Sequence, residues 1–559
     1  MSGGEALTQS LIREGVEVVF GIPGIHMSGS VVAMRDDAAI EHITTRHEGG
    51  ATNMAYGYAR ASGKPGVALV VPGAGVYNAA SGMATAFARS TPVLLIAGQI
   101  SRPQMGKDLG AIHEVFNQME TLAPVTKWRR QAMRPREIPA AVSEAFRQMR
   151  TGRPRPVYLE MPPEVAVERE EVQLRDSAPV SRIVPSPDDL RRAADVIANS
   201  RLPLIYAGGG VMQSGAEGVL RELVETTNIP VITSSGGKGA IPDNHPLTYG
   251  SCLSPAAETL ELNQLLDVMQ SADVMIGVGA RFSIGNPAGE ACTLININID
   301  DRDLTRIQAN TLPLHGDVKA TLEALLPFLR EAGADNRPSP AEAVEAARRL
   351  IAYYDIRQQE PQYAVLETIK QSIPEETITV WDVTQFGYYS RTHYQVNLPG
   401  TYIDSGFSFN LGHAFPTALG AKVGKPGTPV VCFTGDGGFM FNASELSTAV
   451  KYGINTVTVV FRDDAYGNVA RDLEDFFGGS YGTDLHNPDL VKFAESFGVV
   501  GLRTEDPSDL ATLLPEALAL NAPVVIDVPV GHLDLPRSKF MTHLPRVAWT
   551  QPQQGMIAS

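Results

Sequence analysis

The chain has 559 residues, and its 46 Lys and Arg against 62 Asp and Glu give a formal net charge of -16. A hydrophobic share of 43% and a charged share of 19% are typical of folded globular proteins and argue against a disordered chain. The acidic balance argues against a nucleic-acid partner, because binding to a phosphate backbone depends on Lys and Arg. A chain of this length exceeds what one hydrophobic core can hold, so we expect several domains.

The N-terminal segment and the cysteines bear on where the protein is expected to act. MSGGEALTQSLIREGVEVVFG lacks a basic stretch followed by an apolar run, so we expect no signal peptide. No run of 18 apolar residues occurs, so we expect no transmembrane helix and no membrane partner. Cys252, Cys292 and Cys432 stand far apart without a CxxC pair, which favours free thiols in a reducing compartment. We therefore expect a cytoplasmic protein.

Short apolar runs rich in β-branched residues recur along the chain, each followed by a Gly-rich turn and a helical pattern. They lie at residues 67–71, 93–97, 204–207, 274–278, 430–433 and 456–461. Apolar strands alternating with helices are typical of parallel sheets covered on both faces. Two stretches without periodicity, 165–187 and 332–341, are interpreted as linkers. The sequence thus predicts an α/β protein with three doubly wound parallel-sheet domains, at 1–165, 185–330 and 355–535.

Residues 536–559 differ in composition from the three predicted domains. They are polar, contain Pro, Gln and Gly, and show no pattern of buried positions. Either a loose tail or a flap over a site is compatible with this composition.

The strongest local signal lies in the predicted third domain. A buried strand ends in Gly435, Asp436 and Gly437 before a helix, and the next strand ends near Asp463. A strand–helix–strand unit brings both strand ends to one edge of the sheet, where ligands bind. Two carboxylates there can meet one hard cation such as Mg²⁺, and the glycines let the backbone approach phosphate oxygens. The alternative is a pair of unrelated turns at strand ends.

A second candidate site lies in the predicted first domain, after a short strand at 40–45. Glu48 stands between this strand and the helix that follows, directly before small residues, and is well placed to face a ligand. A carboxyl group in this position can exchange a proton with a bound molecule. The alternative is a glutamate that interacts only with the dipole at the start of the helix.

Together these features resemble the thiamine-diphosphate enzymes of the acetolactate synthase, pyruvate decarboxylase and benzaldehyde lyase group. The resemblance covers nearly the whole chain and includes residues 208–216, 279–282 and 487–490. It departs from the family at Arg462 and Asp463, where the family has Asn-Asn. The family implies a pyrimidine-binding domain, a middle domain and a diphosphate-binding domain, with thiamine diphosphate and Mg²⁺ as cofactors.

The resemblance also implies roles for individual residues. Asp436 and Asp463 would bind the metal through their side chains, and Ala465 through its carbonyl. Glu48 would hydrogen-bond the pyrimidine ring and activate the cofactor. Leu411 would lie under the bend of the cofactor, with an ordinary core leucine as the alternative. The other candidates for cofactor contacts are Pro23, Gly24, Gly73, Asn78, Gln385, Gly435, Gly437, Gly438, Tyr466 and Gly467.

Three side chains of the first domain are candidates for contact with the substrate. His26 lies in the loop 20–27, where benzaldehyde lyase has an acid/base histidine and acetolactate synthases have a small residue. A neutral imidazole there can move protons during bond formation or cleavage. His113 lies near the position of the active-site glutamine of acetolactate synthases. A surface or capping role is the alternative for both histidines, and Gln99 is a further candidate for the lining.

Parts of the acetolactate synthase pattern are missing. The arginine that helps that family select its second 2-oxo acid is absent from residues 283–286, and its partner tryptophan aligns with Asp472. We therefore expect weak discrimination for 2-oxobutyrate. The middle domain also lacks part of the FAD-contact pattern, so bound FAD is doubtful. Lys238, in the Gly-rich loop 236–239, suits a nucleotide phosphate but is more simply a solvated side chain.

The resemblance implies an enzyme that acts on small 2-oxo acids, aldehydes or hydroxyketones. We expect decarboxylation of a 2-oxo acid, followed by carboligation of the carbanion–enamine to an acceptor carbonyl. The alternative reaction is that of an acyloin (2-hydroxyketone) lyase/ligase, and the alternative class is a cofactor-binding paralogue without turnover. Because the family builds its site from two subunits, we expect a homo-oligomer, at least a dimer and by resemblance a tetramer.

Overall fold

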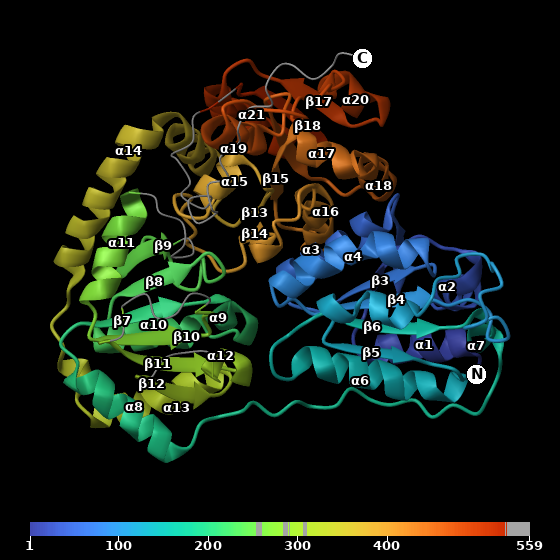
Figure 1. Cartoon of the computed structure of the whole chain (residues 1–559), viewed down its shortest axis with the longest axis horizontal. Helices are drawn as coiled ribbons and strands as arrows, with labels where there is room; N and C mark the ends of the chain where they lie inside the picture. The colour runs from blue at the N-terminus through green and yellow to red at the C-terminus, as the bar shows by residue number, and fades with distance from the viewer. Residues whose placement is uncertain (253–259, 283–288, 290, 306–309, 532, 534–559) are drawn as a thin grey trace, which may run out of the picture.

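The computed structural model describes residues 1–252, 260–282, 289, 291–305, 310–531 and 533. The molecule has three lobes, each built around a six-stranded parallel sheet with flanking helices (Figure 1). The predicted α/β class with three parallel-sheet domains is thus confirmed. Two segments singled out in the sequence, 283–286 and 536–559, lie outside the described residues.

The first lobe contains a sheet with the strand order β2-β1-β3-β4-β6-β5. Its strands are β1 (Val18–Gly21), β2 (Glu41–Thr44), β3 (Gly66–Val70), β4 (Val93–Gly98), β5 (Trp128–Gln131) and β6 (Val157–Met161). Its helices are α1 (Gly3–Arg13), α2 (Ser28–Asp36), α3 (Glu48–Ser62), α4 (Ala74–Ala88), α5 (Gln118–Thr121), α6 (Ile138–Arg150) and α7 (Pro163–Val167). Strands β3, β4 and β6 are buried along their whole length, which explains their continuous apolar sequences.

A long connection without helix or strand leads along the edge of the molecule to the middle lobe (Figure 1). The sheet of this lobe has the order β12-β11-β10-β7-β8-β9. Its strands are β7 (Pro203–Ala207), β8 (Val231–Ser234), β9 (Thr248–Cys252), β10 (Val274–Val278), β11 (Thr293–Asn298) and β12 (Thr311–His315). Its helices are α8 (Pro187–Asn199), α9 (Gly209–Ser214), α10 (Glu217–Thr227), α11 (Leu260–Ser271), α12 (Asp301–Thr305) and α13 (Val318–Glu331).

The 32-residue helix α14 (Ala341–Ser372) connects the middle lobe to the third lobe (Figure 1). The third sheet has the order β14-β13-β15-β16-β18-β17. Its strands are β13 (Ile378–Trp381), β14 (Tyr402–Asp404), β15 (Val430–Gly435), β16 (Val457–Arg462), β17 (Val500–Arg503) and β18 (Val524–Pro529). Its helices are α15 (Gln385–Ser390), α16 (Ala414–Gly424), α17 (Asp436–Asn442), α18 (Leu446–Tyr452), α19 (Gly467–Phe477), α20 (Leu490–Ser496) and α21 (Leu510–Ala519).

The first and third sheets share one topology. When each sheet is numbered from its own first strand, both have the order 2-1-3-4-6-5. The helices that follow the second strand, α3 and α16, pack against each other and join the two lobes. This approach requires glycine, because a Cβ at Gly57 would lie 1.9 Å from the Thr417 carbonyl oxygen, and one at Gly420 would lie 1.9 Å from that of Met54. One hydrophobic core therefore contains side chains of both lobes.

Candidate active site

A cavity of about 170 Å³ opens at the carboxyl ends of the strands in the third lobe. This is the edge at which open parallel sheets bind ligands. Ten of the residues that the sequence singled out for cofactor or metal contact line it: Gln385, Leu411, Gly435, Asp436, Gly437, Gly438, Asp463, Ala465, Tyr466 and Gly467. The structure therefore brings together residues that lie up to 82 positions apart in the sequence.

Two carboxylates in this cavity lie in an environment that disfavours negative charge. Asp436 begins helix α17 directly after β15 and is 1% exposed. Its burial, together with the charge of Asp463, raises the pKa of Asp436 to about 6. Burial also raises the pKa of Asp463. A bound cation would stabilise both ionised carboxylates, because an opposite charge beside a buried carboxylate offsets the cost of burying its negative charge.

Two glycines, Gly438 and Gly467, form part of the cavity wall with their main chain alone. A Cβ at Gly438 would lie 2.7 Å from an oxygen of Asp382, and one at Gly467 would lie 2.0 Å from an oxygen of Asp463. A side chain at Gly467 would displace Asp463, which lines the cavity, and one at Gly438 would displace Asp382, which accepts the Gly412 N–H at 3.1 Å, so glycine keeps the space beside both carboxylates open.

The donor set fits a hard divalent cation bound together with a phosphate group. Mg²⁺ prefers oxygen ligands, often one or two carboxylates completed by substrate phosphates. Asp436 and Asp463 provide two carboxylates, and the carbonyl of Ala465 is a third candidate oxygen. Among the described residues no cluster of three or more His, Cys, Asp or Glu side chains could hold a metal. A metal in this cavity would therefore depend on main-chain and phosphate oxygens as well as the two carboxylates.

The sequence reasoning missed a residue that contacts this site from another segment. The side-chain amide of Asn487 donates to an Asp436 oxygen at 2.6 Å and to an Asp464 oxygen at 2.9 Å. Its segment is held beside the end of β16, since the Leu485 N–H donates to the Asp464 carbonyl at 2.8 Å. The sequence signal was residues 487–490, which carried part of the family resemblance but received no role.

Arg462 does not line the cavity, although it replaces the first asparagine of the family pair. Its guanidinium bonds to Asp527 and Asp464, both at 3.0 Å. The extra charges introduced at 462 and 463 therefore have separate surroundings: the arginine is paired outside the cavity, and Asp463 lies within it.

Glu48 lies on the first lobe, at the first position of helix α3. It is 9% exposed, and the Asn78 amide on α4 donates to its Oε2 at 3.0 Å. A further missed residue, Glu445 of the third lobe, fixes the main chain just before it. Oε1 of Glu445 accepts the N–H groups of Arg46 at 2.9 Å and His47 at 3.0 Å. The position of Glu48 is thus set from both lobes.

His26 and His113, both in the first lobe, lie side by side. Their ring centroids are 5.4 Å apart in an edge-to-face arrangement. Burial lowers the pKa of His26, and neighbouring His113 lowers it further. Within the described part of the chain, Nδ1 of His26 is buried without a hydrogen-bond partner. The Gly73 turn packs against the main chain of His113, because a Cβ at Gly73 would lie 2.4 Å from the His113 carbonyl oxygen.

The remaining first-lobe candidates are more varied in placement. Pro23 is exposed, and Gly24 packs against Val71, whose Cγ1 would lie 2.1 Å from a Cβ at Gly24. Gln99 is buried and points into the lobe: its amide donates to Glu160 at 3.3 Å and its carbonyl accepts the Ile100 N–H at 2.7 Å. Gln99 therefore supports the main chain around it instead of presenting its side chain at the surface.

Within one chain, the two candidate ends are separate. The described residues that line the third-lobe cavity all belong to the third lobe, and neither Glu48 nor the two histidines are among them. A ligand that contacts both Glu48 and Asp436 would therefore need a second source for one of its two walls.

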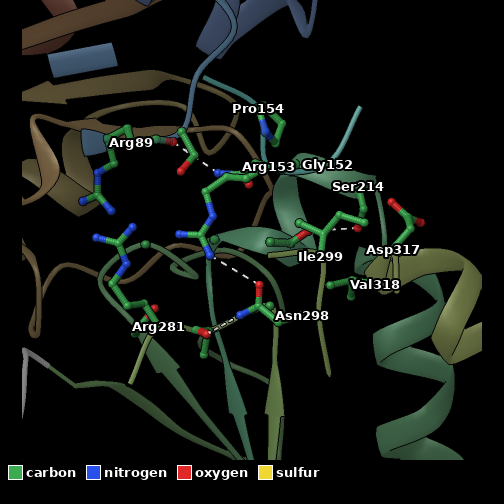
Figure 2. Close-up of a pocket in the computed structure, with 18 of the residues that line it drawn as sticks. Arg89, Gly152, Arg153, Pro154, Ser214, Arg281, Asn298, Ile299, Asp317 and Val318 are labelled. Carbon is green, nitrogen blue, oxygen red and sulfur yellow. Dashed lines mark hydrogen bonds between the residues drawn. The ribbon is translucent and has the colours of Figure 1, made fainter. Parts of the chain in front are cut away.

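A larger cavity of about 380 Å³ lies between the first and middle lobes (Figure 2). Six arginines line it: Arg60, Arg89, Arg150, Arg153, Arg182 and Arg281. Figure 2 shows Arg153 extending into the cavity, where it bonds to Asn298 at 3.3 Å and pairs with Asp300 at 2.9 Å. The middle-domain motifs of the sequence meet here through Gly209, Gly210 and residues 279–281. The middle domain lacks part of the FAD-contact pattern, and the expectation that bound FAD is doubtful stays a prediction for this cavity.

Lys238 has a different environment from the solvated one considered above. It is 4% exposed, and its ammonium group pairs with Asp243 at 3.3 Å and with the Ser251 hydroxyl at 3.2 Å. The solvated interpretation is wrong, because the loop folds inward and the buried charge is compensated by a carboxylate.

Among the described helices, none combines the length and apolar character needed to cross a membrane.

Comparison with known proteins connects these features. Models of the thiamine pyrophosphate enzymes match three parts of the chain: the N-terminal TPP binding domain matches residues 1–121, the central domain 190–325 and the C-terminal TPP binding domain 382–528. Thiamine pyrophosphate is another name for thiamine diphosphate. The three matches fall on the three lobes in order.

Several full-length relatives share about a third of their residues with this chain. A probable acetolactate synthase large subunit of Methanocaldococcus jannaschii is 33% identical over 94% of this chain and 92% of its own length. A probable 2-ketoarginine decarboxylase of Pseudomonas aeruginosa is 32% identical over 91% and 90%. Acetolactate synthase isozyme 3 large subunit of Escherichia coli is 31% identical over 95% of both chains. The protein therefore belongs to the thiamine pyrophosphate enzymes, in an acetolactate synthase-like group.

Proposed function

We propose that this enzyme uses thiamine diphosphate and Mg²⁺ to decarboxylate a 2-oxo acid and to join the product to an acceptor carbonyl. The observation that carries the proposal is the cavity around Asp436 and Asp463, in which ten residues singled out for the cofactor and metal meet. The names of its relatives support the reaction class, since they include acetolactate synthases and a 2-ketoarginine decarboxylase.

The third lobe would hold the diphosphate end. Asp436 and Asp463 would bind Mg²⁺ through carboxylate oxygens, and Ala465 through its carbonyl. Asn487 donates to the Asp436 carboxylate at 2.6 Å and so orients the oxygen that it leaves for the metal. Leu411, which lines the same cavity, would support the bend of the cofactor.

The first lobe would hold the pyrimidine end. When bound, thiamine diphosphate supplies an acidic thiazolium C2–H and an electron sink for loss of CO₂. Glu48 would hold a proton on its carboxyl group and exchange it with the pyrimidine ring. Asn78 fixes one oxygen of this carboxyl group by donating at 3.0 Å, and Glu445 fixes the preceding main chain. These contacts would hold the Glu48 carboxyl group in place before the cofactor binds.

His26 would move protons at the substrate. Burial lowers its pKa, so its imidazole is neutral at neutral pH and can accept a proton. The same histidine is the basis of a second candidate reaction, acyloin (2-hydroxyketone) cleavage and formation, because His26 lies where the resemblance places the acid/base histidine of benzaldehyde lyase, and His113 lies beside it. Aldehydes and hydroxyketones are the substrates of this alternative.

The active assembly would be a homo-oligomer, at least a dimer, in which Glu48 of one chain faces the cavity of another. Its support is that the described cavity residues of one chain include none from the first lobe. Large apolar side chains are also exposed beside the site residues on both lobes: Ile25 is 75% exposed and Ile112 72%, next to His26 and His113, and Phe441 is 57% exposed on α17. Light scattering coupled to gel filtration tests this, and a mass of a single chain at micromolar concentration contradicts it.

The proposed activation is tested by the exchange of the C2 proton of thiamine diphosphate for deuterium in the presence of Mg²⁺. We expect exchange well above the solvent rate, and a loss of about 10²- to 10⁴-fold in Glu48→Gln, the range that general acid–base groups contribute. Glu41→Gln is the matched control, since Glu41 is exposed on the strand before Glu48. If the unaltered protein exchanges the C2 proton only at the solvent rate, the proposal is contradicted.

A product screen separates the two reactions. Pyruvate, benzoylformate, benzoin, glycolaldehyde and formaldehyde are each incubated with the loaded enzyme, and the products are identified by mass spectrometry. Release of CO₂ with a ligated product from a 2-oxo acid supports the first reaction. Cleavage of benzoin without any reaction of the 2-oxo acids supports the second.

A further inference from the structure

A carboxylate with neutral partners is buried inside the first lobe. Glu160, on β6, is fully buried, and four groups donate to it. Oε1 accepts the amides of Gln131 at 2.6 Å and Gln99 at 3.3 Å, and Oε2 accepts the amide of Gln118 at 2.9 Å and the hydroxyl of Tyr158 at 2.5 Å. An ionised carboxylate only accepts hydrogen bonds and has about four acceptor sites, so these four neutral donors match its capacity.

The third lobe offers an internal comparison, because its sheet has the same topology. Asp527 on β18 occupies the place of Glu160, as it pairs with Arg503 of the neighbouring strand, where Glu160 pairs with Gln131. Asp527 is also fully buried, but its partners are the guanidinium groups of Arg503 at 2.8 Å and Arg462 at 3.0 Å. The same buried position is thus charge-paired in one lobe and surrounded by amides in the other.

Neutral donors have a property that arginine lacks: an amide that donates with its nitrogen still accepts with its oxygen. Gln118 uses both ends. Its nitrogen donates to Glu160 and to the Gly98 carbonyl at 2.9 Å, while its oxygen accepts the Gly73 N–H at 2.7 Å. Glu160 is therefore linked through one side chain to the main chain at the ends of both β3 and β4.

Those two strand ends support the candidate catalytic side chains. Gly73 starts the turn into α4, which carries Asn78 and hence the hydrogen bond to Glu48. Gly73 also packs against the His113 main chain, and a Cβ at Gly98 would lie 2.9 Å from Cβ of His26. Displacement of either strand end would therefore move Glu48 or the histidine pair.

We propose that Glu160 is a positioning residue that, through Gln118, fixes the Gly73 turn and the end of β4 under Glu48 and His26. This inference rests on the proposed function, because it assigns to Glu160 the task of holding that site in its productive geometry. Gln131 bonds to the same carboxylate, and among the described residues its side chain has no hydrogen bond to the Gly73 turn, so it provides a comparison within the same lobe.

The test compares Gln118→Met with Gln131→Met. Each substitution removes one amide donor from Glu160 and keeps an unbranched side chain of similar size. We expect both variants to lose thermal stability, Gln118→Met more than Gln131→Met, because Gln118 is 1% exposed and bonds to Glu160, Gly98 and Gly73, whereas Gln131 is half-buried; exchange is therefore compared at a temperature at which both variants stay folded. Only Gln118→Met is expected to slow C2–H/D exchange, by about 10- to 100-fold, the cost of a displacement near 1 Å in a catalytic group. The affinity for thiamine diphosphate in the presence of Mg²⁺, measured by calorimetry, is expected to stay unchanged in Gln131→Met; exchange is compared at saturating cofactor, because Gly73 and Asn78 are candidates for cofactor contacts and their displacement in Gln118→Met is expected to lower this affinity.

Two results would overturn the proposal. Equal losses of exchange in the two variants would mean that Glu160 acts only through stability, and no loss in Gln118→Met would mean that the link to Gly73 is dispensable. Glu160→Gln is the companion variant, and it is expected to match Gln118→Met. If it fails to fold, the comparison of the two glutamine variants still decides.

A second readout separates this inference from the proposed function. Deuterium uptake by the main-chain amides of residues 71–80 is followed by mass spectrometry in the unloaded protein. Gln118→Met is expected to increase uptake in this segment, and Gln131→Met is not. If the unaltered protein shows no C2–H/D exchange, the proposed function fails, while this measurement still supports or overturns the positioning role.

Discussion

The first and third lobes have the same strand order but different chemistry at their strand ends. In the third lobe the turns after β15 and β16 carry Asp436 and Asp463, two carboxylates within one cavity. In the first lobe the matching turns after β3 and β4 carry Gly73 and Gln99, which are neutral and bonded into the lobe. One topology thus provides a cavity with two carboxylates, which attracts cations, and a lobe in which the candidate proton-transfer group, Glu48, lies on a helix away from the matching turns.

The difference shows how the fold separates binding from proton transfer. The third lobe accumulates negative charge that burial makes unfavourable, which a metal can offset. The first lobe satisfies its buried carboxylate, Glu160, with three amides and the Tyr158 hydroxyl, and it carries Glu48 and the histidine pair on other segments. Each of the following substitutions is expected to alter one of these two properties while leaving the other in place.

The largest effect is expected for Asp436→Asn. Loss of an outer hydrogen-bond partner of a metal ligand costs about 10- to 100-fold in affinity, so loss of a ligand charge is expected to cost more than about 100-fold. Calorimetric titration with Mg²⁺ and thiamine diphosphate measures it. The matched control is Asp475→Asn, because Asp475 is exposed on α19 of the same lobe and does not line the cavity. Equal affinities of the two variants would contradict the metal assignment.

His26→Ala tests the first lobe alone. We expect kcat/KM to fall by about 100-fold on the substrate that the product screen identifies, since a positioned general acid or base contributes at least that much. C2–H/D exchange is expected to be unaffected, because Glu48 and Asn78 are intact. An equal fall in both rates would show that the histidine supports the fold of the site and does not act on the substrate.

Asn487→Ala is expected to have a smaller effect on the third lobe. The Mg²⁺ affinity should fall by about 10- to 100-fold, because Asp436 loses the donor that orients it. The exchange rate at saturating Mg²⁺ and cofactor is expected to recover. If saturation leaves the rate low, Asn487 has a role beyond orienting the metal ligand.

The smallest effect concerns pH. Burial lowers the pKa of His26 below its ordinary value of 6.5, so more than half of the folded protein keeps a neutral imidazole at pH 6.5. We therefore expect kcat/KM to fall less than about twofold between pH 8 and pH 6.5, and to fall steeply at lower pH. His26→Ala should lose this acid limb.

The same shift has a consequence for stability. Below pH 6.5 the unfolded chain binds a proton at His26 more readily than the folded chain does, so this residue lowers the free energy of unfolding as the pH falls. Chemical denaturation of the unaltered protein and of His26→Ala at pH 7.5 and pH 5.5 measures the contribution of His26 to the free energy of unfolding. If the difference in the free energy of unfolding between the unaltered protein and His26→Ala does not depend on pH, the burial of a neutral imidazole is contradicted.

Several features of the site followed from the sequence because they depend on local rules. The apolar runs at 67–71 and 430–433 became buried strands β3 and β15, since continuous apolar strands need covering on both faces. The approach of Asp436 to Asp463 followed from the geometry of a strand–helix–strand unit, which fixes where both strands end. Glu48 lies at a helix start, as its place before small residues indicated.

Other features were decided only by the tertiary structure. Asn487 meets Asp436, Glu445 holds the main chain before Glu48, and Gln99 points inward to Glu160, although each pair lies far apart in sequence. The direction of a side chain at a strand end depends on register and on what packs against it, and these depend on non-local contacts. The sequence by itself determined which residues stand at strand ends; the packing of lobes and strands decided which of them face a ligand and which support those that do.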